Sequence, residues 1–181
     1  MLAHPNSLQD AESFSALYAR TQLVIFRFIY GLHGGPLKDV EDLACDTYLR
    51  AWKGRDRFSG DEQDALCWLF TIARHLVIDA HRRRKIRLDD ASEQLDDTTL
   101  ASTFESTQGS PEDQVSSREQ YIHLWHLLQS LPDDRREMLV LRYMLGWQVK
   151  QIAQYLNMEE NTVSVYIRRS LEQIRHNWTL E

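Results

Sequence analysis

The stretch QVKQIAQYLNMEENTVSVYIRRSLEQIR, residues 148–175, decides the fold. Its first part places apolar side chains at positions i, i+3, i+4 and i+7, the spacing of a one-sided helix: Val149, Ile152, Ala153 and Leu156. Asn157 follows, and asparagine is one of the few residues that tolerates the left-handed backbone with which many helices end. We therefore expect a short helix, a tight turn and a second helix.

The second helix is predicted over residues 160–175, with different chemistry on its two sides. One side is apolar: Val163, Ile167, Leu171 and Ile174. The other side is mixed: Thr162, Val165, Tyr166, Arg168, Arg169 and Gln173. With the small Ala153 where the two helices must approach closely, this is the layout of a helix-turn-helix that binds DNA.

The rest of the chain also predicts helices. Seven glycines and four prolines in 181 residues are few, and alternating strand-like runs are scarce, so we expect an all-α protein. Upstream, helices are predicted at 13–30, 39–54 and 65–80, the last continuing into a basic run, and downstream at 111–131 and 132–146. Asp39 is the expected N-cap of the second helix, and Asp61 or Asp64 that of the third.

Charge divides the chain into parts. The formal net charge is −6, but residues 88–119 hold nine acidic residues and one basic residue, a local charge of −8 that leaves +2 for the remainder. Periodicity is absent between residues 88 and 109, where polar and acidic residues dominate. We predict two small helical domains, 1–87 and 110–181, joined by an acidic flexible linker, 88–109.

Several features indicate a soluble cytoplasmic protein. The two cysteines, Cys45 and Cys67, fall within helical apolar patterns and suit buried thiols better than a disulfide framework. The N-terminus shows no signal-peptide pattern. The longest apolar run, residues 23–29, contains Arg27 and is too short to span a bilayer, so we expect no membrane insertion.

Motifs of catalysis and cofactor binding are missing from the sequence. It contains no glycine-rich phosphate loop, serine elbow or spaced carboxylate pair, so an enzyme is not expected. His123 and His126 lie one helical turn apart, but two histidines without a third ligand are a weak signal, and we expect no metal and no cofactor.

Three strings of sequence, in this order, resemble the extracytoplasmic-function (ECF) group of the sigma-70 family of RNA polymerase sigma factors. The first is residues 39–52, DVEDLACDTYLRAW, similar to family region two where it grips the polymerase clamp. The second is residues 68–79, WLFTIARHLVID, with Arg82-Arg83-Arg84, similar to the segment that recognises and melts the promoter −10 element. The third is Leu131-Pro132, residues 135–137 and 141–143, and the helix-turn-helix, similar to region four, which recognises the −35 element.

The chain departs from the family at two places. Members usually carry glycine at the position of Asn157, and asparagine reaches the same backbone region. Members also often carry basic residues at the positions of Ser164 and Tyr166, so the recognition helix here has fewer basic side chains.

The resemblance implies a promoter-specificity subunit that binds core RNA polymerase and directs promoter recognition, DNA melting and transcription initiation. Its implied partners are core polymerase, promoter DNA as −35 duplex and melted −10 strand, and an anti-sigma factor. It also implies that the acidic linker reaches toward the polymerase active-site cleft; the alternative is a solubilising tether.

The resemblance and the residue types together give three candidate surfaces. The polymerase-binding residues are expected to be Asp39, Glu41, Asp42, Asp46, Tyr48, Leu49 and Trp52. Those at the −10 element are expected to be Phe58, Ser59, Trp68, Phe70, Arg74, His75, Arg82, Arg83, Arg84 and Lys85. Those at the −35 element are expected to be Thr162, Val165, Tyr166, Arg168 and Arg169.

Some alternatives stay open. Trp68 and Phe70 are equally explained as core aromatics, and the basic run as a solvated charge run. Arg168 and Arg169 suit guanine edges or phosphate. The competing functions are a helix-turn-helix operator-binding regulator with an N-terminal dimerisation or sensing module, and an interaction protein that sequesters a partner.

Overall fold

The computed structural model describes residues 8, 10–90, 120 and 123–178, without the side chains of residues 85–90. In these ranges all regular structure is helical, which confirms the predicted all-α fold. The chain divides into two units, Met1–His33 with Lys38–Ser92 and Gly34–Leu37 with Glu93–Glu181, and each is described by itself. Most of the predicted linker, from residue 91 onward, lies outside the described residues.

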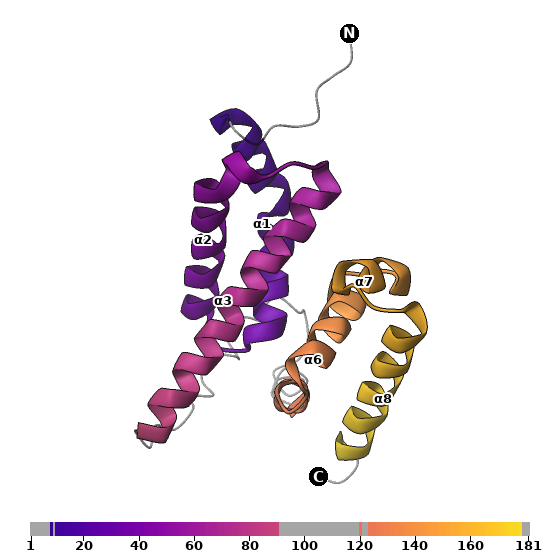
Figure 1. Cartoon of the computed structure of the whole chain (residues 1–181). Coiled ribbons are helices and arrows are strands. Elements are labelled where there is room, and N and C mark those ends of the chain that lie inside the picture. Colours follow the sequence, from indigo (N-terminus) through magenta and orange to yellow (C-terminus); the bar gives the residue numbers. More distant parts are fainter. Residues whose placement is uncertain (1–7, 9, 91–119, 121–122, 179–181) are drawn as a thin grey trace, which may run out of the picture. The chain divides into compact units, whose positions relative to one another are not determined.

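The first unit is built from three helices, α1 (Ala11–His33), α2 (Leu37–Gly54) and α3 (Glu62–Asp90), shown in Figure 1. They bury apolar stripes that recur at helical spacing. On α1 the stripe includes Leu17, Ile25 and Phe28, and the Phe28 ring lies 4.5 Å from that of Phe70 on α3. These aromatic contacts form the centre of the core.

The N-termini of α2 and α3 differ from each other. α2 begins at Leu37, so Asp39 lies inside its first turn and the prediction that Asp39 caps the helix is wrong. The preceding residue is Pro36, whose ring fixes φ near its helical value and so favours the start of a helix at this point. Asp61 does cap α3, because its Oδ1 accepts hydrogen bonds from the backbone N–H groups of Gln63 and Asp64, at 2.8 and 2.9 Å. α3 then continues to Asp90, beyond the predicted domain boundary at residue 87.

The second unit contains the predicted helix-turn-helix. Residues 123–129 are helical, and α6 (Asp133–Leu139), α7 (Val149–Leu156) and α8 (Glu160–Trp178) follow. Asn157 adopts the left-handed conformation, with φ of 52°. The N–H groups of Asn157 and Met158 donate to the carbonyls of Gln154 and Ala153, at 3.3 and 2.9 Å, which closes the end of α7. The predicted motif is therefore confirmed.

The predicted helix over 132–146 changes its winding halfway. α6 passes into a π-helical turn, Val140–Met144, in which the N–H of Leu145 donates to the carbonyl of Val140 at 3.1 Å. Gly146, with φ of 73°, ends it as predicted. The wider turn carries Tyr143 and Met144 on the surface, and such turns often occur at functional positions.

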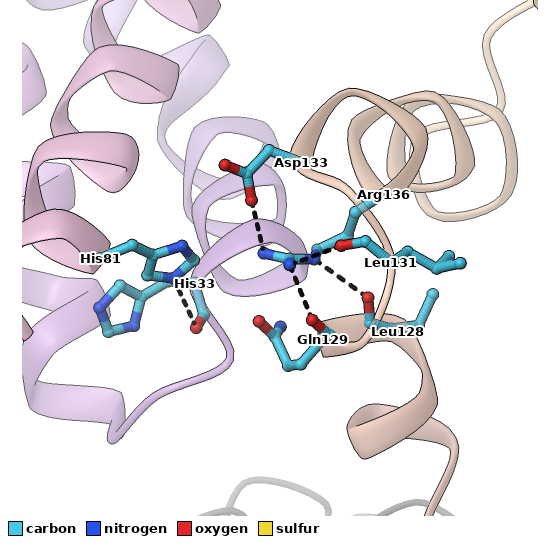
Figure 2. A network of polar contacts seen from close by, with 7 residues as sticks. All are labelled: His33, His81, Leu128, Gln129, Leu131, Asp133 and Arg136. Atoms are coloured by element: carbon cyan, nitrogen blue, oxygen red, sulfur yellow. Dashed lines mark hydrogen bonds and ion pairs between the residues drawn. The ribbon is translucent and has the colours of Figure 1, made fainter. Parts of the chain in front are cut away.

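A buried arginine joins α6 to the helix before it (Figure 2). The guanidinium of Arg136 donates to the carbonyls of Leu128, Gln129 and Leu131, at 3.0 to 3.1 Å, and lies 3.4 Å from the carboxylate of Asp133. The carbonyls of Leu128 and Gln129 lie in the last turn of that helix, where backbone acceptors have few intrahelical partners, and that of Leu131 lies just beyond it. The Leu128 carbonyl also accepts from the N–H of Leu131, at 3.2 Å. Burial lowers the pKa of Arg136, and Asp133 opposes this, so the side chain remains charged.

We expect Arg136→Met to destabilise the second unit by about 3 kcal/mol, because one buried and two part-buried carbonyls lose a charged donor while the aliphatic volume is kept. Urea denaturation of the variant measures this cost. The matched control is Arg169→Met on exposed α8, which should change the free energy of unfolding by less than about 0.5 kcal/mol. Equal effects of the two substitutions would contradict the capping role.

A buried histidine lies at the end of α1. Burial, together with the charges of His81 and Arg84, lowers the pKa of His33 from 6.5 to about 4, and Asp39 partly opposes this shift. The Nε2 atom of His81 lies 3.3 Å from the His33 carbonyl oxygen (Figure 2). His33 is therefore neutral in the folded chain at neutral pH.

This gives a pH dependence with a defined sign. Between pH 6.5 and about 4 the unfolded chain binds a proton at His33 that the folded chain does not, so the free energy of unfolding falls as pH is lowered through this window. The slope contributed by this one group is at most about 1.4 kcal/mol per pH unit. Urea denaturation of wild type and His33→Gln at pH 7, 6 and 5 measures it. The difference between the two proteins should change with pH, and a constant difference would contradict the assignment.

Candidate functional site

The exposed side of α2 carries acidic side chains. Asp39, Asp42, Asp46 and Leu49 follow one another at spacings of three and four residues, so they lie along one side of the helix, and all are exposed. Glu41 is exposed beside them. Leu49, at the end of this row, is 50% exposed. An acidic row that ends at an exposed apolar side chain suits a protein partner.

Two aromatic residues predicted for this surface lie deeper. Tyr48 is buried, and its hydroxyl lies 2.8 Å from the hydroxyl of Thr21 on α1. Burial raises the pKa of Tyr48 to about 12. Trp52 is half-buried, with its ring edge-on to Phe14 at 5.1 Å and the Arg55 guanidinium 3.6 Å from its centroid. The structure therefore places Tyr48 in the core, and only the outer part of Trp52 is accessible to a partner.

The cysteines correct another expectation. Cys45 is exposed, between Asp42 and Asp46 on α2, so the prediction that it is buried is wrong. Its apolar neighbours in sequence, Leu43 and Ala44, face inward instead. Cys67 is half-buried on α3, where burial and the nearby carboxylates raise the pKa of its thiol.

The loop between α2 and α3 presents an aromatic pair. After the short 3-10 turn Arg55–Arg57, the ring of Phe58 stacks on that of Trp68, with centroids 5.0 Å apart and planes 23° apart. Both are half-buried, and Ser59 beside them is exposed. Half-exposed rings at a loop are the arrangement on which unpaired bases stack.

Phe70 does not belong to this surface. It is fully buried against Phe28, so the alternative that it is a core aromatic is the one the structure shows. Val77, one heptad further along α3, is buried too. The buried side of α3 therefore includes Phe70 and Val77 beside Leu69, Ala73 and Leu76.

The basic positions of α3 are largely accessible. His75, Arg82 and Arg83 are exposed, and Arg74 and Arg84 are half-buried. Arg83 donates from Nε to the carbonyl of Asp79 at 3.2 Å, which directs its stem along the helix. Lys85 lies in α3, but its side chain is outside the described part of the chain.

The outer side of α8 carries the residues predicted to bind DNA. Arg168 and Arg169 are exposed, and Thr162, Val165 and Tyr166 are half-buried. Arg168 lies 3.8 Å from Glu172, an exposed ion pair of little stability. The inward side is Val163, Ile167 and Ser170, whereas Leu171, predicted to be buried, is 37% exposed. The helix is therefore rotated slightly from the predicted orientation.

Two arginines, Arg135 and Arg55, were not assigned to these surfaces from the sequence. The Arg135 guanidinium lies over the Tyr166 ring, 5.5 Å from its centroid, and Arg55 lies over Trp52. The first contact joins α6 to α8, and no local sequence pattern could reveal a pair so far apart in sequence. The second joins residues three apart, but their spacing alone does not specify stacking.

The described residues form neither a membrane-spanning helix nor a cluster of metal ligands. No helix among them is long and apolar enough to cross a membrane. No three His, Cys, Asp or Glu side chains of the same residues are arranged to hold a metal ion, and His123 instead packs edge-on to Trp178 at 4.7 Å.

Comparison with known proteins matches both units. Residues 17–87 match the family model "Sigma-70 region 2" and residues 122–174 match "Sigma-70, region 4". The chain is 28% identical over 170 residues to ECF RNA polymerase sigma factor SigL of Mycobacterium tuberculosis, covering 92% of this chain and 89% of SigL. It is 27% identical to ECF RNA polymerase sigma factor BldN of Streptomyces coelicolor, covering 91% of this chain but only 60% of BldN.

Solved structures share the fold. The sigma factor RpoE of Bartonella quintana, solved in complex with the anti-sigma factor NepR, gives a TM-score of 0.68 at 19% identity, covering 94% of this chain and 99% of RpoE. CnrH, solved with the cytosolic domain of CnrY, gives 0.63 and covers 95% of this chain and 91% of CnrH. In sequence, CnrH of Cupriavidus metallidurans is 30% identical over 171 residues, 94% of this chain and 88% of CnrH. With these matches over both units, the chain belongs to the sigma-70 family of RNA polymerase sigma factors, in its ECF group.

Proposed function

We propose that this chain is a promoter-specificity subunit, which binds core RNA polymerase and directs promoter recognition, DNA melting and transcription initiation. The observation that carries this proposal is the presence in one chain of both sigma units, region 2 over 17–87 and region 4 over 122–174. The subunit is not itself catalytic, and it acts in the cytoplasm, where the polymerase is.

The polymerase contact is assigned to the exposed side of α2. Asp39, Asp42 and Asp46 supply negative charge for a basic partner surface, and Leu49 supplies an apolar contact at the end of their row. Apolar side chains that lose water at the centre of an interface contribute most of its affinity, whereas charges at its rim affect association rate and specificity. Tyr48 supports this surface from beneath through its hydrogen bond to Thr21.

The −10 contact is assigned to the loop after α2 and the outer side of α3. Arg82 and Arg83 are exposed where they can release counterions from phosphate, a contribution independent of sequence. The Phe58 and Trp68 stack supplies the aromatic surface that holds bases after the strands separate, about 1–3 kcal/mol per base. Melting is favoured because unpaired bases can stack on these rings, whereas bases paired within the duplex cannot.

The −35 contact is assigned to α8, whose exposed Arg168 and Arg169 suit base edges or phosphates. Thr162 lies near the helix start, where a hydroxyl suits a phosphate oxygen. An anti-sigma protein is the expected regulator, since the solved relative RpoE was captured with one. An operator-binding regulator is not favoured, because it would leave the region 2 match of the first unit without a role.

Run-off transcription tests the proposed function. Its templates are promoter fragments selected by the protein together with core polymerase. One substitution tests the assigned polymerase contact. Leu49→Ala should lower core polymerase affinity about tenfold, because it removes the apolar centre of the interface. Its free energy of unfolding should change by less than about 0.5 kcal/mol, since the side chain is half exposed. Titration by fluorescence anisotropy measures the affinity.

The matched control is Leu23→Ala on α1, a leucine with a similar exposed fraction of 55%. It should leave polymerase affinity unchanged. Equal losses from both substitutions would remove the assignment to α2. Absence of any promoter-dependent transcript, with no co-migration with core polymerase, would overturn the proposed function itself.

A further inference from the structure

A cation from α6 lies over an aromatic ring of α8. The guanidinium carbon of Arg135 is 5.5 Å from the centroid of the Tyr166 ring, and both residues are half-buried. This distance is within the range of a cation–π contact. The contact brings a positive charge from outside the helix-turn-helix to the side of its second helix.

The ring belongs to one row of side chains on α8. Thr162, Tyr166, Arg169 and Gln173 are spaced by four, three and four residues, so they lie along one side of the helix. Arg169 is exposed in this row. Arg135 therefore adds a second positive charge beside that of Arg169, at the flank of the surface assigned to the −35 element.

The two acids that precede Arg135 in α6 do not face it. The exposed carboxylate of Asp133 lies 3.4 Å from the buried guanidinium of Arg136. Asp134 precedes Arg135 directly, and adjacent positions on a helix do not face one another. On α8, Arg168 is paired with Glu172.

We propose that Arg135 contacts a DNA phosphate beside the −35 element, and that Tyr166 positions Arg135 instead of contacting a base. A guanidinium that lies over a ring keeps its N–H donors in its own plane, directed past the ring edge, where a phosphate accepts two of them. α6 thereby supplies a positive charge to the surface of α8.

This inference rests on the proposed function and is tested in the holoenzyme. The probe is a promoter duplex selected from a randomised library by the wild-type holoenzyme, and affinity is measured from 50 to 200 mM salt. Arg135→Gln should reduce the slope of log affinity against log salt by about 1, the value for one lost phosphate contact. Affinity at the lower salt should fall about fivefold, equally for the selected −35 sequence and for a scrambled one.

Three further variants separate positioning from stability. Tyr166→Leu should weaken binding less than Arg135→Gln, and the double variant should bind no more weakly than Arg135→Gln alone, because both act on one contact. Tyr166→Arg in the Arg135→Gln background should restore the salt slope. Arg27→Gln, which removes an exposed charge from α1, is the control and should leave the slope unchanged.

The outcomes are distinct. An unchanged slope in Arg135→Gln, or a loss confined to thermal stability and not reversed by Tyr166→Arg, overturns the role of Arg135. A loss that depends on the −35 sequence also overturns it, because that would be base recognition. Failure of the wild-type holoenzyme to select any duplex would instead overturn the proposed function.

Discussion

The buried guanidinium of Arg136 fixes the framework on which the second unit depends. It binds three carbonyls at the end of the preceding helix and the carboxylate of Asp133, so it determines where α6 begins and how α6 is turned. Arg135 stands one position earlier on the same helix and therefore points in another direction, toward Tyr166 of α8. One arginine of the pair satisfies backbone acceptors inside the unit, and the other carries charge to its surface.

In the first unit, some aromatic side chains lie in the core and others lie at the surface, as the two arginines do in the second unit. Phe70 and Tyr48 are buried and hold the three helices together, whereas Phe58 and Trp68 stack at the loop and stay half exposed. Rings in the core limit how the helices can move, and this keeps the loop pair in a constant position. A base that stacks there would meet a surface that needs little reorganisation, which lowers the entropic cost of binding.

Much of the architecture could be predicted from local rules. The turn at Asn157, the stop at Gly146 and the cap at Asp61 each depend on the backbone preference or hydrogen bonding of a single residue, and all three occur in the structure. What could not be predicted depends on partners distant in sequence. Phe70 is buried because Phe28 lies opposite it, and Leu171 is exposed because the orientation of α8 is set by its packing on other helices. The placement of Arg135 has the same origin.

The length of α3 has a consequence for promoter geometry. The helix is continuous from Glu62 to Asp90, with the loop aromatics near its beginning and the arginine run toward its end. At 1.5 Å per residue, Trp68 and Arg82 are separated by roughly 21 Å along the axis, about six base-pair steps of duplex. An uninterrupted helix bends little over this length. On the proposed function, the distance between captured bases and held backbone is set by the protein and does not adapt to the DNA, so inserting or deleting a base pair between them would be poorly tolerated.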